Sequence, residues 1–504
     1  MNWASANSET LVACATLTLL AAFITVVLSV FFGSVLAFHA RPTFRYGATL
    51  ALLFIPFSIG SSVWAYSVTR LASWSGMQGD LVASGTWYRA IALLLFCIGR
   101  TLPLGTFFCA TTLQRYTMEI RPYFQTHHIG LPFFLLCALN RIPKSILMLV
   151  GLFGGALMAS EAALATFLYR ANPGTQPETA NIMLARLFRE VYASAGPESL
   201  SRVAALGVFV SLLLLIAAFL GTLAGTGTLR LARNWLGRSH SITGIGAVFC
   251  SVLAHVGLTL CLLPGILGLI GLFAPTNISD TTPATVLEQA FNYREIIALG
   301  TLVGGSIITI GIAVAVRLRY GHNDLLTWFE NKPLAACILL LPAFVPILSV
   351  VAVLGMVSRG QMKGFAGYLS LFISHLGLHY SVFQFICMAL IAAIPERHVS
   401  WQRAMRMRYF FSLMTDGFMR HSTVLLSLVG LCIIQVITDG SVSRWFSHLV
   451  KAPEEALYAA IFGRLSNAAE AVTIAWSVGL IAITVCSILA TAYVRELASH
   501  PRYA

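Results

Sequence analysis

Long apolar runs recur along the whole chain, and they constrain its fold more than any other feature. Of the 504 residues, 58% are hydrophobic and 10% are charged, whereas a soluble globular protein carries about 25% charged residues. Runs of about twenty apolar residues are long enough to cross a lipid bilayer as helices. The sequence therefore predicts an all-α, polytopic membrane protein and excludes a water-soluble enzyme or binding domain.

Eleven apolar runs, bounded by polar residues or by Gly and Pro, are candidate membrane spans, each long enough for a hydrocarbon core of ~30 Å. Their predicted limits are 10–38, 47–69, 90–113, 143–166, 203–227, 241–274, 295–316, 333–357, 365–393, 422–438 and 470–494. No basic residue precedes the first run, which is unlike a cleaved signal peptide and predicts that the first helix is retained.

Charge in the connecting segments predicts the orientation. With the N-terminus outside, 19 of the 32 basic residues and 6 of the 19 acidic residues fall in cytoplasmic segments, and the outer side is neutral. The positive-inside rule then favours an outer N-terminus and a cytoplasmic C-terminus. An excess of basic residues is also typical of proteins that bind nucleic acid. Here the basic residues lie between membrane spans, which favours the interpretation that they fix the orientation of the chain in the membrane.

The ten cysteines all lie in apolar segments, and no Cys-x-x-Cys pair occurs among them. This distribution indicates neither a disulfide framework nor a metal site. The cysteines are interpreted as small buried hydrophobic residues.

Short pieces recur in the same order in two parts of the chain, although any single match could arise by chance in apolar sequence. The pairs are Leu53–Phe57 with Leu339–Ala343, Phe107–Cys109 with Phe385–Cys387, and Glu161 with Asp439. The basic stretch Arg230–Arg238 separates the two sets. We therefore predict two homologous halves, residues 1–238 with five spans and residues 239–504 with six, as repeats are common in transporters.

One connecting segment, residues 114–143, has a distinctive spacing: a polar, basic stretch reaches Gly130, and Ile142-Pro143 follows. Gly permits a sharp turn or close approach, and Pro suits the first turn of the next helix. Arg121 and His127 offer hydrogen-bond donors to an acidic partner surface. The alternative is an ordinary cytoplasmic connection that carries orienting arginines.

With this spacing, the chain resembles the permeases of type I binding-protein-dependent ABC importers, most closely the fused subfamily that serves ferric-iron and thiamine uptake. In each half of that family a cytoplasmic loop carries Glu-Ala-Ala, a Gly four residues later, and an apolar-x-Leu-Pro ending thirteen residues after the Gly. Gly130, Ile142 and Pro143 hold the Gly, Leu and Pro positions, while the triplet falls on Phe124-Gln125-Thr126, a departure from the pattern.

The second half is further from the family pattern, in the loop 394–421. Its triplet falls on Gln402-Arg403-Ala404 and its Gly position on Arg408, so only Ala404 matches. The resemblance implies ten residues in ATPase-coupling loops: Arg121, Gln125, His127, Gly130, Ile142, Pro143, Gln402, Arg403, Ala404 and Arg408.

The sequence contains no G-x-x-x-x-G-K-[ST] phosphate-binding motif. An ATP-driven function then requires two separate ATP-binding-cassette subunits, with ATP bound on those partners and no cofactor on this chain. The resemblance also implies a periplasmic solute-binding protein. Apolar-periodic pieces at 182–191 and 456–465 predict short helices at the outer surface, either a docking face for that protein or a cap packed on the bundle.

Three ionisable residues near the membrane are candidate pathway residues: Arg100, near a membrane edge, and Glu161 and Asp439, at matching places in the two halves. The two acids either line a cation pathway or face water at helix ends. The histidines in apolar segments, among them His255, are interpreted as hydrogen-bonded to neighbouring backbone. The sequence shows no signature of chemistry at a covalent bond.

These observations predict a transport subunit and no enzyme activity. The leading hypothesis is the membrane permease of an ABC importer in a bacterial inner membrane, which moves a small solute by alternating access. An ion-coupled secondary transporter is the alternative. A polytopic membrane enzyme would need clustered Asp, His or Lys at one membrane face, and the sequence shows none. Iron, thiamine, polyamines and small anions all remain compatible as solutes.

Overall fold

The computed structural model describes five continuous stretches and twelve single residues between them. The stretches are 7–39, 86–126, 144–161, 197–238 and 244–271. The single residues are Tyr46, Thr49, Leu50, Leu52, Leu53, Pro56, Ile142, Thr179, Ala180, Ile182, Met183 and Leu187. The five stretches form helices, and no strand occurs in the part of the chain that is described.

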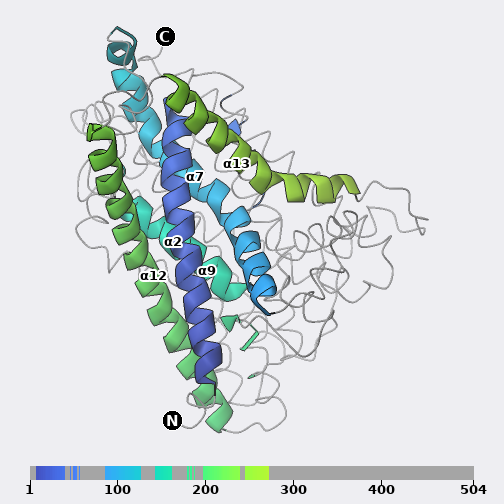
Figure 1. Cartoon of the computed structure of the whole chain (residues 1–504). Coiled ribbons are helices and arrows are strands. Elements are labelled where there is room, and N and C mark those ends of the chain that lie inside the picture. Colours follow the sequence, from blue (N-terminus) through green and yellow to red (C-terminus); the bar gives the residue numbers. More distant parts are fainter. Residues whose placement is uncertain are drawn as a thin grey trace, which may run out of the picture.

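Five long helices make up the described bundle (Figure 1). They are α2 (Ser8–Phe38), α7 (Thr86–Thr126), α9 (Lys144–Ser160), α12 (Pro197–Arg238) and α13 (Gly244–Gly271). Within the described residues, three stretches are apolar and long enough to cross a membrane: Ser8–Phe38, Tyr88–Ala110 and Ser201–Gly227. Lipid offers no hydrogen-bond partners to the backbone, and a helix satisfies its backbone N–H and C=O groups internally. The prediction of an all-α chain is confirmed for this part, and three of its helices have the length and composition of membrane spans.

The α2 helix lies at the centre of the bundle and contacts α7, α9, α12 and α13. Its contacts with α7 advance along both helices in the same order, from Thr25 against Thr101 to Gly33 against Cys109, so the two helices run parallel. In Figure 1, α12 runs in the same direction as α2.

The α9 and α13 helices run the opposite way. Along α9, Gly155 lies against Ala217 of α12 and Gly151 against Gly221, so the contacts advance in opposite directions on the two helices. Phe32 of α2 lies against Gly257 of α13, and His39 hydrogen-bonds Ser251. Helices α7, α9, α12 and α13 therefore alternate in direction in the order in which they follow along the chain.

Glycines bring α9 and α12 into direct backbone contact, which we call the glycine contact. It consists of Gly151 and Gly155 on α9 and Ala217, Gly221 and Gly225 on α12. A Cβ atom added at Gly221 would lie 2.9 Å from Gly151 Cα and 3.0 Å from the Leu147 carbonyl oxygen. Small residues four apart on both helices are the usual means of close packing between membrane helices.

The α12 helix also exposes a continuous apolar stripe. Its members recur at helical spacing and are more than half exposed: Val208, Leu212, Ile216, Phe219 and Leu223. The opposite face, including Leu214 and Ala217, is buried against the bundle. A helix that is apolar on both its buried and its exposed face suits a lipid environment.

Two helices continue past their predicted spans. The third predicted span, 90–113, overlaps the apolar stretch Tyr88–Ala110, while α7 itself continues to Thr126 and takes in the first part of the predicted loop 114–143. Glu, Gln, Arg and Met are good helix formers, so loss of hydrophobicity does not end the helix there. Likewise, Arg230–Arg238, predicted as the connection between halves, forms the last turns of α12.

The fourth span is shorter than predicted. We expected residues 143–166, but α9 ends at Ser160. Its 17 residues rise only about 25 Å at 1.5 Å per residue, which is less than a hydrocarbon core of about 30 Å. The predicted spans after residue 274, and with them most of the second half, lie outside the described residues.

Candidate functional site

Arg100 is buried in the middle of the apolar stretch Tyr88–Ala110 of α7, with 5% of its surface exposed. The sequence suggested a place near a membrane edge; in the structure α7 begins at Thr86, and nearly four helical turns precede Arg100. Its neighbour Thr101 is hydrogen-bonded to Thr25, near the midpoint of α2. Arg100 therefore lies at mid-depth of the bundle.

Glu161 follows the last residue of α9 and is also buried, with 1% of its surface exposed. The alternative that this carboxylate faces water at a helix end is wrong. The C-terminal end of α9 is therefore buried within the bundle.

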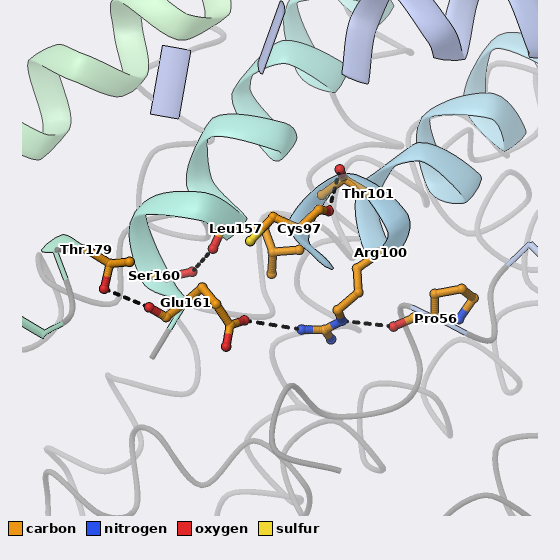
Figure 2. Close-up of polar contacts among 8 residues, drawn as sticks. All are labelled: Pro56, Cys97, Arg100, Thr101, Leu157, Ser160, Glu161 and Thr179. Carbon is orange, nitrogen blue, oxygen red and sulfur yellow. Dashed lines mark hydrogen bonds and ion pairs between the residues drawn. The ribbon is translucent and has the colours of Figure 1, made fainter. Parts of the chain in front are cut away.

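The structure brings these two charges together, although 61 residues separate them in the sequence. The Arg100 Nη1 atom lies 4.0 Å from Glu161 Oε2, and Arg100 Nε donates a hydrogen bond of 3.2 Å to the Pro56 carbonyl (Figure 2). Burying either charge alone would be costly, and the opposite charge offsets part of that cost. The separation exceeds the 2.7–2.9 Å of a direct charge-assisted hydrogen bond, so this ion pair is electrostatic in character.

A threonine binds the backbone at the end of α9. The Thr179 hydroxyl donates to the Glu161 carbonyl oxygen over 2.7 Å (Figure 2). It also accepts from the Ile182 amide over 3.3 Å. The Met183 amide also bonds the Thr179 carbonyl, as in the first turn of a helix. Thr179 thus acts as an N-cap and holds the start of a helical segment beside the end of α9.

This helical segment was predicted at 182–191 as a short outer helix. Ile182, Met183 and Leu187 are helical and buried. Burial of these side chains suits the alternative of a cap packed on the bundle better than that of an open docking face.

Hydroxyl groups connect α7 to α2 next to Arg100. The Thr101 hydroxyl lies 2.9 Å from the Cys97 carbonyl, to which it donates, and 3.1 Å from the Thr25 hydroxyl. Both threonines are buried. A hydroxyl in a membrane helix commonly bonds a carbonyl one turn earlier and is then able to bridge to a neighbouring helix.

A second buried arginine lies on the same face of α7. Arg89 is eleven residues, or three helical turns, before Arg100, and 1% of its surface is exposed. Sequence reasoning missed Arg89, and the eleven-residue spacing was the signal that could have found it. Thr25, Thr101 and Thr179 were missed as well, because isolated threonines in apolar sequence carry no pattern.

Few of the predicted coupling residues fall in the described part of the chain. Arg121 and Gln125 lie in the last turns of α7, and Ile142 is buried just before α9 begins at Lys144. The others lie outside the described residues: His127, Gly130, Pro143, Gln402, Arg403, Ala404 and Arg408. Asp439, the predicted counterpart of Glu161, also lies outside them.

The structure confirms the histidine prediction at His255, whereas the cysteine prediction holds for three of the five cysteines described: Cys250 and Cys261 are only partly buried. His255 Nδ1 lies 2.7 Å from the Ser251 carbonyl one turn earlier, which is the predicted hydrogen bond to neighbouring backbone. Cys14, Cys97 and Cys109 are buried as small hydrophobic residues. No group of three His, Cys, Asp or Glu side chains is gathered among the residues described here.

Comparison with known proteins adds no relative: no protein-family model matches the chain, and neither a curated protein nor a solved structure matches it. The buried ion pair at the end of α9 is therefore the candidate functional site on physical grounds. Ionisable residues at mid-depth of an apolar bundle are costly, and they usually belong to transport pathways or proton relays.

Proposed function

We propose that this chain is the membrane subunit of an ABC importer, which carries a small solute across a bacterial inner membrane by alternating access. The support from the structure is an apolar bundle with a lipid-suited face on α12, helices of alternating direction, and an ion pair at mid-depth. The support from the sequence is the spacing from Gly130 to Ile142-Pro143.

The orientation follows from the basic ends of the helices. Because α2, α7 and α12 run parallel, the C-terminal ends of α7 and α12 emerge on one face, together with the N-terminal end of α9. Basic residues are concentrated there: Arg115, Arg121, Lys144, Arg230, Arg233 and Arg238. By the positive-inside rule this face is cytoplasmic, so the N-terminus lies outside; the charge pattern of the remaining loops puts the C-terminus inside.

The extension of α7 is the observation that carries the proposal. In the sequence the apolar run ends near Leu113, and the helix continues to Thr126, which adds about 20 Å at 1.5 Å per residue. The chain then passes Gly130 and re-enters the bundle at Lys144. A helix that continues beyond its apolar part is a suitable element for transmitting force from a soluble ATPase.

In this proposal, two ATP-binding-cassette subunits dock under the two halves and hold the ATP. The first contacts the loop around Arg121, Gln125, His127 and Gly130, and the second contacts the loop around Arg403 and Arg408. A periplasmic solute-binding protein delivers the solute at the outer face. The chain itself carries out no covalent chemistry.

Reconstitution tests the proposal. Purified chain in liposomes, with its ATPase subunits, is expected to take up solute from the binding protein only with ATP. Gly130→Leu is expected to lower ATP-dependent uptake at least about tenfold, because a side chain blocks close approach at the turn, while membrane insertion is unchanged. Gly227→Ala is the matched control, because a Cβ at Gly227 meets nothing within 4 Å. Normal uptake and normal ATPase binding by Gly130→Leu would contradict the coupling role.

An ion-coupled secondary transporter is the second candidate, and the ion pair beside the end of α9 favours it. Such transporters often place charged residues and interrupted helices near the membrane midplane. This alternative predicts uptake by the chain alone under an ion gradient, without ATP or partners. The same liposomes, tested without ATPase subunits, distinguish the two functions.

A further inference from the structure

We propose that Arg100 and Glu161 form an ion-pair gate, whose separation opens the first half of the bundle to water at mid-depth. The inference rests on the proposed transport function, since a gate has meaning only where a solute passes. It goes beyond that function because it names the contact that has to break when access alternates.

The ion pair joins chain segments that are far apart in sequence. Arg100 on α7 contacts Glu161 at the end of α9 and the carbonyl of Pro56, while the Glu161 carbonyl is held by Thr179. Figure 2 shows the Arg100 guanidinium between Pro56 and Glu161. Separation of α7 from the end of α9 therefore has to break the ion pair.

Other contacts of α9 are unsuited to opening. On the α12 side, Gly151 and Gly221 meet through backbone atoms, and such close packing is lost entirely if the helices part. On the α7 side, the charges are 4.0 Å apart, and water is able to solvate both when they separate. Water compensates a separated ion pair far better than it compensates separated apolar surfaces.

A native cysteine is placed to report the opening. Cys97 is fully buried, lies one turn before Arg100 on α7, and its carbonyl accepts the Thr101 hydroxyl. Cys109 is equally buried twelve residues further along α7, against Gly33 of α2. The two cysteines share a helix, but only Cys97 adjoins the ion pair.

The test is alkylation in liposomes by a small water-soluble maleimide, on full-length chains that keep either Cys97 or Cys109 as the sole cysteine. Arg100→Gln and Glu161→Gln are each expected to speed labelling of Cys97 by about tenfold or more, because the attraction between the two charges that holds α7 against the end of α9 is then lost. Labelling of Cys109 is expected to stay slow in both variants.

Using both variants separates opening from a direct effect on the thiol. Loss of the carboxylate favours the reactive thiolate and loss of the guanidinium disfavours it, so an effect on thiolate formation alone has opposite signs in the two variants. Faster labelling in both supports the gate, and opposite signs overturn it. The double variant Arg100→Gln/Glu161→Gln is expected to label more slowly than either single variant, because no unpaired charge remains.

Two further outcomes overturn the proposal: unchanged labelling of Cys97 in both single variants, and equal acceleration at Cys109, which indicates general loosening of the bundle. The measurement uses neither ATPase subunits nor solute. If the labelling contradicts the gate, ATP-driven uptake can therefore still be tested on its own. If the uptake assay fails, the labelling result still stands.

Discussion

At the scale of single residues, glycine decides how closely the helices pack. Glycines at Gly151 and Gly221 face each other across α9 and α12, whereas Gly227, two turns further along α12, has open space beside it. The same residue type thus has opposite roles on one helix. A side chain at Gly221 has to displace backbone atoms, and a side chain at Gly227 displaces nothing.

Alanine substitution tests this difference. Gly221→Ala is expected to lower the free energy of unfolding by about 1–3 kcal/mol, the usual cost of overpacking. Gly227→Ala is expected to raise it by about 0.5–1 kcal/mol, because alanine loses less backbone entropy in a helix. Thermal unfolding of the two purified variants in one detergent provides the measurement. Equal melting temperatures would show that the helices are not in contact at Gly221.

The ion pair could be predicted from the sequence only in part. Arg100 and Glu161 were singled out because charges in apolar segments are rare. Their contact could not be predicted, because it depends on α9 ending early and on the angle at which α9 crosses α7. Helix propensity determines neither the end of α9 nor its crossing angle with α7, because both result from tertiary packing.

At the scale of helices, hydrophobicity located the elements but not their ends. The first predicted span, 10–38, agrees with α2 to within two residues, because Asn7 and His39 bound a single apolar run. The extensions of α7 and α12 were missed, because a helix continues through polar residues that favour it and does not end at the membrane surface. Helix ends are set by local backbone preference, whereas membrane boundaries are set by hydrophobicity.

The exposed stripe of α12 tests whether this element faces lipid. Ile216 is 53% exposed and lies within the apolar stretch Ser201–Gly227. Ile216→Asp is expected to impair insertion by about 2.5–3.5 kcal/mol, the cost of an acid at the centre of a membrane helix. At an exposed position of a water-soluble protein, a substitution usually changes the free energy of unfolding by no more than about 0.5 kcal/mol. The amount of chain in the membrane fraction gives the readout, with Ile216→Leu as the control.

At the scale of the whole molecule, the direction of the helices determines which residues share a face of the membrane. Glu9 at the start of α2 and Lys144 at the start of α9 are both exposed, and they lie at opposite ends of the bundle. The duplication into halves at 1–238 and 239–504 stays a prediction, since most of the second half is outside the described residues.

Cysteine labelling of intact cells tests the orientation. In a chain without native cysteines, Glu9→Cys is expected to react with a membrane-impermeant maleimide from outside. Lys144→Cys is expected to react only after permeabilisation, because the positive-inside rule places it in the cytoplasm. Reversed labelling would overturn the orientation alone, and labelling of both sites from outside would overturn the alternation of the helices as well.

The glycine contact has a mechanical consequence. Backbones in direct contact leave no flexible side chains to absorb sliding, so α9 and α12 are expected to move as one rigid body. Any hinge in this half then lies elsewhere, and α7 offers one: Pro103 lacks an amide hydrogen, which leaves the Gly99 carbonyl without its usual partner next to Arg100. Motion of the first half is thus expected to bend α7 at Gly99. This residue is next to Arg100, whose charge faces the rigid body formed by α9 and α12.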